Sequence, residues 1–494
     1  MTRRLDRRTA DSRLSPAWVV GLFALGLAAR LPGLLFNGMA DLDEIVAVWG
    51  AEVSHYGLAA AFRINYGLLS YAVYGPLYDL GAQLPRFWWA PYKAAEIGSE
   101  ALVLVALAAL LPARHRWAAL VLYWLNPWFI LHGAYQGFWE GPHLLLGLLA
   151  VLALRSLRDE RLGWLAAGAL LMGSALFKPQ GLAYFVVPLF IYLFFQALRG
   201  RWAALLCYAA GVAAVVIAGS IAIVALGGRW TALYTNYFSA VDVMPNLCNG
   251  CVNVWRTVVV ALQYRLSAGG PTYLFTAPPW LDRPLHALAA VASLTLLALL
   301  TVRLPLGPTT LRAGWLGRPA RAMAAVQAVM ARGLGAEPSA VATHSVLLVV
   351  MAYASLVIAQ VGTRAHINHT YTAMVLLIPL VVGRPRWLAA WLIMVGIQFY
   401  AHVVTYRLGR SLVAPEYVAN PAAARALLDN LGAATSAYPR LLAIQARVND
   451  LISGHLPAEP LLAALAFVTF LCAVYLIVAI LRDPRPAPDR ESPA

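Results

Sequence analysis

The first apolar run of the chain reads Ala17-Trp-Val-Val-Gly-Leu-Phe-Ala-Leu-Gly-Leu-Ala-Ala-Arg-Leu-Pro-Gly-Leu-Leu-Phe36, and Gly38-Met-Ala-Asp-Leu-Asp-Glu-Ile-Val-Ala-Val-Trp49 follows it directly. The second stretch places three carboxylates, Asp41, Asp43 and Glu44, within four positions. They lie where a chain has just left a bilayer, and acidic residues at a membrane boundary are costly to desolvate. The stretch alone leaves two interpretations open: a functional site, or carboxylates that cap the next helix.

The composition is that of an integral membrane protein. Of the 494 residues, 61% are hydrophobic and 12% are charged, and the mean hydropathy is +0.69. Continuous apolar runs of about 18 residues or more recur along the chain, which predicts membrane-spanning helices and excludes a soluble protein. We attribute the formal net charge of +15 to arginines in cytoplasmic loops and near anionic headgroups, and expect membrane lipids but no nucleic acid as partners.

The distribution of arginine sets the expected topology. Nearly every short loop assigned to the cytoplasm carries two or more Arg, so both ends of the chain are placed on the cytoplasmic side of a plasma (inner) membrane. We expect an all-α, multi-pass fold of about twelve transmembrane helices, with the second over roughly 92–112 and the third over roughly 117–134. Tyr- and Trp-rich amphipathic runs in the first external loop predict helices that lie at the membrane interface.

The expected organisation follows from this topology. Its parts are a cytoplasmic basic tail at 1–16, a transmembrane core at 17–385 with external loops 37–91 and 227–284, C-terminal transmembrane helices with an external loop at 386–481, and a disordered cytoplasmic tail at 482–494.

In this topology the unusual polar side chains gather at the external ends of helices, and the helix centres are expected to be bare of charge. The group consists of Asp41, Asp43, Glu44, Lys93, Glu96, Glu100, Glu140, His143, Lys178, Gln180, Arg364, His366 and His369. A carboxylate there can act as a general base on a hydroxyl nucleophile, and cations at helix ends can hold a lipid phosphate. The set favours group transfer from a lipid-phosphate donor over a transporter, whose polar residues would lie near the bilayer midplane.

The order of these residues resembles the GT-C superfamily of integral-membrane glycosyltransferases, which use polyprenyl-phosphate sugars. Asp43-Glu44, with Asp41 just before, is similar to the acidic pair in the first external loop of that superfamily. The other similar elements are Tyr92-Lys-Ala-Ala-Glu-Ile-Gly-Ser-Glu100, Asn126-Pro127 with Gly137 and Glu140, Phe177-Lys-Pro-Gln180, Asn253-Val-Trp255, and Thr363-Arg-Ala-His366 with Tyr371. The resemblance covers mostly residues 36–180, with two later islands, and is nearest to members that use polyprenyl-phosphate mannose.

The resemblance implies an inverting transfer of a sugar, with mannose as the first choice, from a polyprenyl-phosphate donor to a lipid or glycan acceptor. The reaction would take place at the external, periplasmic face. Asp43 is the expected base with Asp41 as the alternative, and Glu44 would orient the base or join both aspartates in holding a divalent cation such as Mg²⁺ or Mn²⁺. The expected residues for the donor phosphate and sugar are Lys93, Glu140, His143, Lys178, Gln180, Arg364 and His366.

Two other classes of function stay open. A flippase or transporter of a lipid-linked saccharide would bind the same lipid phosphate but needs no base. A non-enzymatic scaffold subunit would not bind the donor at all.

The four cysteines indicate little about function. Cys248 and Cys251 form a Cys-x-x-Cys pair in the loop 227–284, and a zinc site would need a second pair. A local disulfide on an oxidising face and two free thiols are both open for this pair. Cys207 and Cys472 lie inside apolar runs and are expected to be packing residues.

Overall fold

The described part of the chain is almost entirely helical. A computed structural model describes residues 15–35, 47–62, 67–84, 89–198, 200–235, 248–249, 252–266, 274–275, 279–304, 342–363, 365–366, 368–405, 447 and 459–484. Its helices are α1 (Pro16–Arg30), η3 (Leu31–Leu35), α2 (Ala47–Tyr56), α3 (Leu58–Ala61), α4 (Leu68–Ala82), α5 (Ala90–Leu110), η6 (Ala113–His115), α6 (Arg116–Ala118), η7 (Ala119–Trp124), α7 (Pro127–Ile130), η8 (Leu131–Tyr135), α8 (Gly141–Ser156), α9 (Glu160–Phe177), η9 (Leu182–Val186), α10 (Val187–Ala197), α11 (Trp202–Ala225), α13 (Val254–Leu266), α14 (Pro279–Arg303), α16 (Thr343–Val361), α17 (His369–Val381), α18 (Pro385–Thr405) and α21 (Glu459–Arg482). The all-α expectation needs one small correction, because three two-residue strands are present: β1 (Cys248–Asn249), β2 (Leu274–Phe275) and β3 (Ala365–His366).

Five of the described helical stretches are long and apolar enough to cross a membrane. They are Pro16–Leu35, Trp202–Ala225, Arg283–Thr301, Thr343–Val361 and Leu461–Arg482. Three further apolar helices are shorter, at 10–17 residues. These features fit an α-helical membrane protein, as the composition predicts, while the count of about twelve spans stays a prediction.

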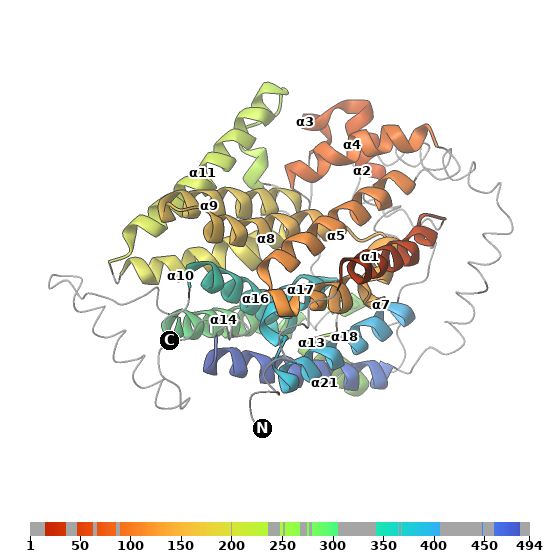
Figure 1. Cartoon of the computed structure of the whole chain (residues 1–494), viewed down its shortest axis with the longest axis vertical. Helices are drawn as coiled ribbons and strands as arrows, with labels where there is room; N and C mark the ends of the chain where they lie inside the picture. Colours follow the sequence, from red (N-terminus) through yellow and green to blue (C-terminus); the bar gives the residue numbers. More distant parts are fainter. Residues whose placement is uncertain are drawn as a thin grey trace.

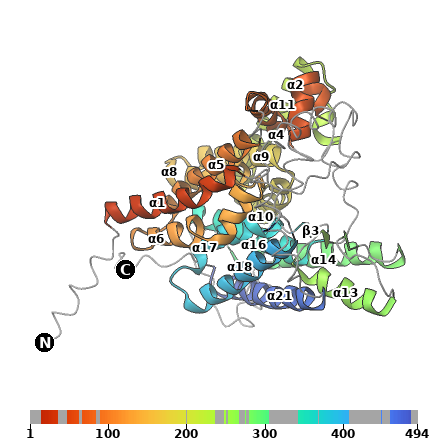
Figure 2. The same cartoon turned by 90° about the vertical axis from the view of Figure 1, so that its right-hand side faces the viewer.

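Helices α16 and α17 form the centre of the bundle, and the other long helices surround them (Figures 1 and 2). In α16, 83% of the most apolar stretch is buried, whereas the corresponding value for the peripheral α11 is 22%. Every residue of α17 after His369 is buried. Since α11 is apolar all round yet exposes most of its surface, lipid is the natural cover for that surface.

Close contact between α9 and α11 depends on glycine. A Cβ atom at Gly168 of α9 would lie inside van der Waals contact with the main-chain carbonyl of Tyr208 in α11. In the same way, a Cβ at Gly211 of α11 would collide with the carbonyl of Leu165 in α9. Small residues of this kind let two helix backbones approach each other within a membrane.

The expected third helix, over roughly 117–134, is broken near its middle. The π-helical turn η7 ends at Trp124, and α7 begins at Pro127. Pro127 has no N–H to continue the preceding helix, and the Asn126 side chain accepts a hydrogen bond of 3.0 Å from Trp128 N at the new N-terminus. The Asn-Pro element therefore starts a second helical segment.

The expected helices of the loop 37–91 are present as α2, α3 and α4. Helices α2 and α4 pack on each other at one end of the bundle, beside α3 and the end of α11 (Figure 1). Their shared interior contains Trp49 stacked on Tyr71, with a ring separation of 5.2 Å. The aromatic residues of this loop thus form a small core, and the location of these helices at a membrane interface stays a prediction.

Candidate functional site

The expected catalytic carboxylates Asp41, Asp43 and Glu44 lie outside the described residues, as does Arg364. His366 is placed by its backbone alone, in strand β3. The structure describes the side chains of the other five expected site residues, which are Lys93, Glu140, His143, Lys178 and Gln180. The divalent-ion prediction concerns the first three carboxylates. Within the described ranges, no group of three His, Cys, Asp or Glu is arranged to hold a metal ion.

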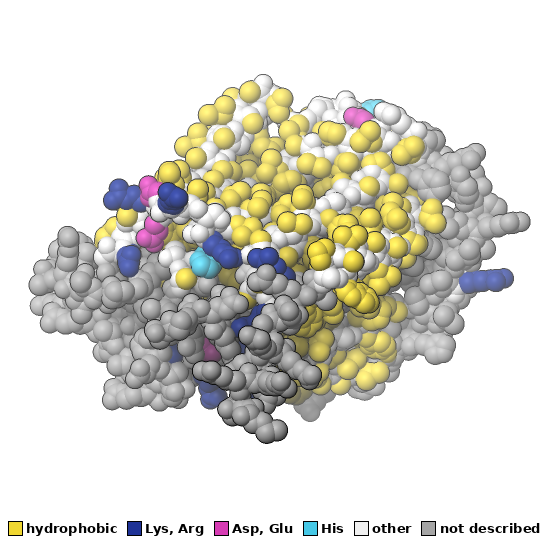
Figure 3. Space-filling view, viewed as in Figure 1, with side chains coloured by type: hydrophobic (Ala, Val, Ile, Leu, Met, Phe, Trp, Pro, Cys, Tyr) yellow, Lys and Arg dark blue, Asp and Glu magenta, His cyan; other side chains and the backbone are white. Residues whose placement is uncertain are grey.

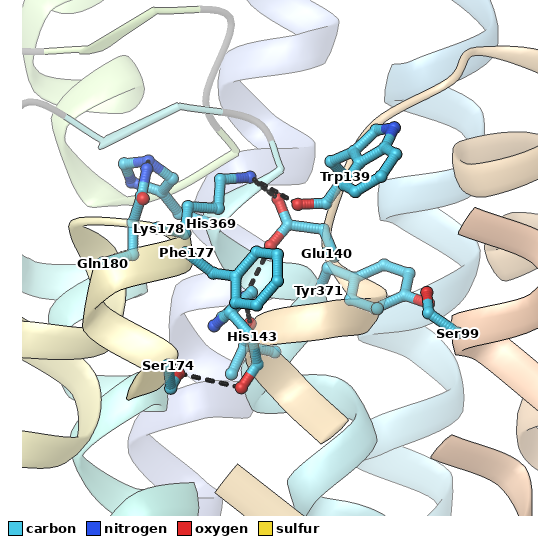
Figure 4. A network of polar contacts seen from close by, with 12 residues as sticks. Ser99, Trp139, Glu140, His143, Ser174, Phe177, Lys178, Gln180, His369 and Tyr371 are labelled. Atoms are coloured by element: carbon cyan, nitrogen blue, oxygen red, sulfur yellow. Dashed lines mark hydrogen bonds and ion pairs between the residues drawn. The ribbon is translucent and has the colours of Figure 1, made fainter. Parts of the chain in front are cut away.

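A buried ion pair joins two of the sequence elements. Glu140 directly precedes α8, and Lys178 directly follows α9. The Lys178 ammonium contacts Glu140 Oε1, and the other carboxylate oxygen, Oε2, lies 2.9 Å from His143 Nε2 (Figure 4). All three side chains are at most 3% exposed. We call Glu140, Lys178 and His143 the charge cluster.

The surroundings of the charge cluster keep Glu140 ionised. Burial by itself raises the pKa of Glu140, but the positive charge of Lys178 and the hydrogen bond from His143 outweigh it and hold the pKa well below its usual range. Glu140 is therefore an anion near neutral pH. It is suited to orienting a cation and is a poor general acid or base, since such groups need a pKa near the working pH.

The charge cluster is also tied to neighbouring helices. His143 Nε2 lies 3.2 Å from Thr372 Oγ1 in α17, and Ser174 of α9 donates a hydrogen bond of 2.8 Å to the His143 carbonyl. Lys178 Nζ donates to the Trp139 carbonyl at 3.4 Å. The cluster therefore joins α8, α9 and α17 at one place.

Glu96 of α5 holds the turn that carries Glu140. Its Oε1 accepts hydrogen bonds from the backbone N–H groups of Glu140, at 3.1 Å, and Gly141, at 2.8 Å. A carboxylate at a helix N-terminus satisfies amides that lack partners inside the helix and interacts favourably with the helix dipole. Sequence reasoning placed Glu96 among the polar residues of this face but gave it no role at the site.

Lys93 is fully buried and contacts main-chain carbonyls. Its ammonium donates to Gly33 O at 2.9 Å and to Tyr135 O at 2.8 Å. These carbonyls belong to η3 and η8, so Lys93 links two helical segments to the start of α5. This geometry favours an anchoring role, and binding of the donor phosphate by Lys93 stays a prediction.

Gln180 lies beside the start of α17. Its Nε2 is 3.0 Å from His369 Nε2, although 189 positions separate the two residues (Figure 4). His369 comes three residues after His366. The Lys-Pro-Gln element therefore lies close in space to the segment that follows the Arg-Ala-His element in the sequence.

The two later islands of the resemblance also meet. Strand β1, from the loop 227–284, pairs in parallel with β3, with Asn249 opposite His366. Asn253 Nδ2 donates to the carbonyls of Ala359 at 3.3 Å and Gly362 at 3.4 Å, and Trp255 Nε1 donates to the Val361 carbonyl at 2.6 Å. The Asn-Val-Trp element thus holds the C-terminal end of α16, which ends three positions before Arg364 in the sequence. The pairing of Cys248 with Cys251 lies outside the described residues.

A second buried ion pair contradicts the expectation that helix centres are bare of charge. Arg30 Nε lies 2.7 Å from Glu100 Oε2, and both side chains are fully buried. Glu100 is in the middle of α5, which runs from residue 90 to residue 110, and its Oε1 accepts a hydrogen bond of 3.2 Å from Tyr371. Arg30 was missed as a functional candidate, although a lone arginine inside an apolar run is a usable signal.

A histidine pair was also missed. His132 Nδ1 lies 3.2 Å from His402 Nε2, and both rings are fully buried. The His132 ring stacks between Phe138 and Tyr371, at ring separations of 4.4 Å and 4.6 Å. Because 270 positions separate the two histidines, no local pattern in the sequence indicates their contact.

The contacts therefore bring together Glu140, Lys178, His143 and Gln180, with Thr372 and His369 from the start of α17. The Lys93 ammonium contacts the Gly33 carbonyl in η3 and the Tyr135 carbonyl at the end of η8. Neither a protein-family model nor a curated protein matches this sequence.

Proposed function

We propose that this protein is a twelve-helix, GT-C-like inverting glycosyltransferase of the plasma membrane. It would move a sugar, with mannose as the first choice, from a polyprenyl-phosphate donor to a lipid or glycan acceptor at the external face. The proposal starts from the resemblance of residues 36–180 and the two later islands to that superfamily. The five long apolar helices support its membrane location.

The buried contact between Glu140 and Lys178 is the observation that carries the proposal. These residues come from two sequence elements that resemble the superfamily, 38 positions apart, and both are almost completely buried. Burying two charges is costly, so an ion pair of this kind is a weak source of stability and is better explained by a role in a site. Gln180 and His369 extend the same site toward the Arg-Ala-His element.

The mechanism assigns each group one step. Asp43 takes the proton from the acceptor hydroxyl, and that oxygen attacks the anomeric carbon on the face opposite the phosphate. The bond between the anomeric carbon and the phosphate oxygen breaks, and polyprenyl phosphate leaves with the electron pair, so the configuration inverts. Lys178 and Arg364 stabilise the negative charge of the leaving phosphate, and Glu140 holds the Lys178 ammonium in place. A divalent ion, if one is used, would be held by Asp41, Asp43 and Glu44, and no step above depends on it.

The test is an assay of purified protein with a panel of polyprenyl-phosphate sugars and extracted native lipids, followed by mass spectrometry of the products. We expect one donor to be consumed, with equal amounts of polyprenyl phosphate and glycosylated product formed. Asp43→Asn should abolish transfer while donor binding survives. Asp159→Asn is the matched control, because Asp159 caps the opposite end of α9 from Lys178 and Asn can make the same cap.

Normal turnover in both Asp43→Asn and Asp41→Asn would show that the base assignment is wrong. Absence of donor binding to the wild-type protein would instead favour a scaffold subunit.

A flippase or transporter is the second candidate, and the buried Arg30–Glu100 pair favours it. Ionisable residues inside membrane helices often mark the path of a transported group, and Glu100 lies in the middle of α5. A transporter would move the lipid-linked sugar across vesicle membranes equally well in the wild type and in Asp43→Asn. Loss of movement in Arg30→Met alone, with no sugar transfer by any variant, would replace the enzyme proposal with this one.

A further inference from the structure

An apolar groove lies along the C-terminal half of α5, whereas the charge cluster is tied to the N-terminal half of α5 through Glu96. It has a volume of about 780 Å³, within the range of roughly 300–1,000 Å³ that is usual for small-molecule sites. Its walls come from the first half of α1 and the second half of α5, with Phe23 and Leu104 among the lining residues. Phe23 stacks on Trp124 at a ring separation of 5.2 Å, with the ring planes 2° apart, so this wall is well packed.

The groove has one basic end. Arg116 and Trp117, at the start of α6, belong to its lining, and Arg116 is the charged residue among the described residues that line it. The Arg116 side chain is exposed and makes no hydrogen bond or ion pair with any residue in the described ranges. Nearby, Arg155 donates a hydrogen bond of 2.6 Å to the Ala109 carbonyl, which brings another guanidinium to the same end of α5.

Two basic segments of the chain that lie outside the described residues are poor candidates to fill the groove. Residues 1–14, which precede α1, carry five Arg and two Asp, and residues 305–341, which join α14 to α16, carry four Arg and one Glu. Both segments are basic and would repel Arg116. Charge complementarity therefore calls for an anionic occupant with a long apolar part.

We propose that this groove binds one anionic glycerophospholipid. The phosphate contacts the Arg116 guanidinium, whose planar fork of N–H donors matches phosphate oxygens. The acyl chains lie against the apolar walls, and Trp117 lies at headgroup depth, as tryptophan does at membrane interfaces. Basic pockets between transmembrane helices on the cytoplasmic side are known to hold anionic headgroups. The positive-inside rule assigns this Arg-rich end to the cytoplasmic leaflet.

The groove is part of the hydrophobic surface of the protein, because Val20 and Val105 in its lining are exposed. Figure 3 shows hydrophobic side chains covering the part of the bundle that contains α1 and α5, with basic side chains gathered at the margin of this region. A lipid in the groove would therefore enter from the surrounding bilayer. The proposal concerns lipid binding alone and does not depend on sugar transfer.

Native mass spectrometry of the full-length protein, released from detergent micelles, tests the proposal. The probes are phosphatidylglycerol and phosphatidylcholine with identical acyl chains, titrated separately. We expect the first bound molecule of phosphatidylglycerol to have a dissociation constant about tenfold lower than the first bound molecule of phosphatidylcholine. The reason is that the zwitterionic lipid, with no net charge, makes a weaker ionic contact with Arg116. Arg116→Gln should remove this preference, whereas Arg158→Gln, at an exposed position after α8, should leave it unchanged.

A second variant tests the apolar part of the site. Ala108→Phe fills the groove at a lining position and should reduce binding of both lipids at the first site while Arg116 is kept. Arg116→Gln changes an exposed side chain, so the test still stands if Ala108→Phe does not fold.

Equal affinity for the two lipids in the wild type would overturn the proposal and indicate ordinary surrounding lipid. A preference for phosphatidylglycerol that survives Arg116→Gln would also overturn it. Tighter lipid binding after deletion of residues 1–14 would show that the chain's own N-terminus occupies the groove.

Discussion

Breaking the Glu140–Lys178 ion pair should strongly destabilise the protein. Lys178→Met removes the ammonium and leaves the Glu140 carboxylate, which is 3% exposed, with His143 as its remaining partner in the charge cluster. Loss of one member of a buried pair costs about 3–5 kcal/mol, because the other charge stays buried without compensation. Glu140→Gln should cost a comparable amount, because it strands the ammonium of Lys178.

The double variant Lys178→Met/Glu140→Gln separates this mechanism from simple loss of packing. It contains no uncompensated charge, so it should lose less stability than the two single variants together, with a coupling energy of about 1–3 kcal/mol. Unfolding in mixed micelles of increasing SDS content, followed by tryptophan fluorescence, measures each free energy. Arg158→Met, an exposed arginine, is the control and should stay within about 0.5 kcal/mol of the wild type.

The same unfolding assay, repeated over a range of pH, tests the charge state of Glu140. Burial raises the pKa of Glu140, but Lys178 and His143 bring it well below its usual range, so the folded protein resists protonation of this carboxyl. The stabilisation is fully present above the unfolded pKa of about 4.3 and is lost as the pH falls through the lower folded pKa. The wild type should therefore lose stability below about pH 4 more steeply than Glu140→Gln. Additive single-variant effects, together with identical acid profiles, would refute the account of the charge cluster.

Three further variants test other parts of the structure in the same unfolding assay. Gly168→Val should cost at least about 1–3 kcal/mol by forcing α9 away from α11, whereas Gly98→Ala, with no atom near its added Cβ, should have little effect. Trp255→Phe removes a hydrogen bond of 2.6 Å to the end of α16 and should cost about 1–3 kcal/mol; under the proposed function it should also raise KM for the donor more than it lowers kcat. Arg30→Met should cost about 3–5 kcal/mol, and adding Glu100→Gln should recover part of that loss if the buried pair acts as described.

The positions of the helices follow closely from the sequence. The helix expected over roughly 92–112 is α5, Ala90–Leu110, and the internal break in the third helix coincides with Asn126-Pro127. Helix positions are predictable because each apolar run is local in the sequence, and so are the groups that cap it. The number of membrane spans is harder to predict from the sequence. Five described stretches are long and apolar enough to cross a membrane by themselves, whereas about twelve spans were expected.

The partners of the charged residues could not be read from the sequence. Residues 38 positions apart form the Glu140–Lys178 pair, and residues 70 positions apart form the Arg30–Glu100 pair. The polar pattern also gave no sign that the Lys93 ammonium would contact the carbonyls of Gly33 and Tyr135.

The physical reason is that hydropathy and capping act over one or two helical turns, whereas an ion pair needs two side chains to meet after the helices have packed. Burial then excludes water from the ion pair, so that a charge left without its partner would destabilise the fold. The role proposed for Asp41-Leu-Asp-Glu44 depends on packing in the same way, because a carboxylate can act as a base only where an acceptor hydroxyl lies within hydrogen-bond reach. In this protein the sequence supplies the helices and the inventory of charges, and packing determines which charge meets which.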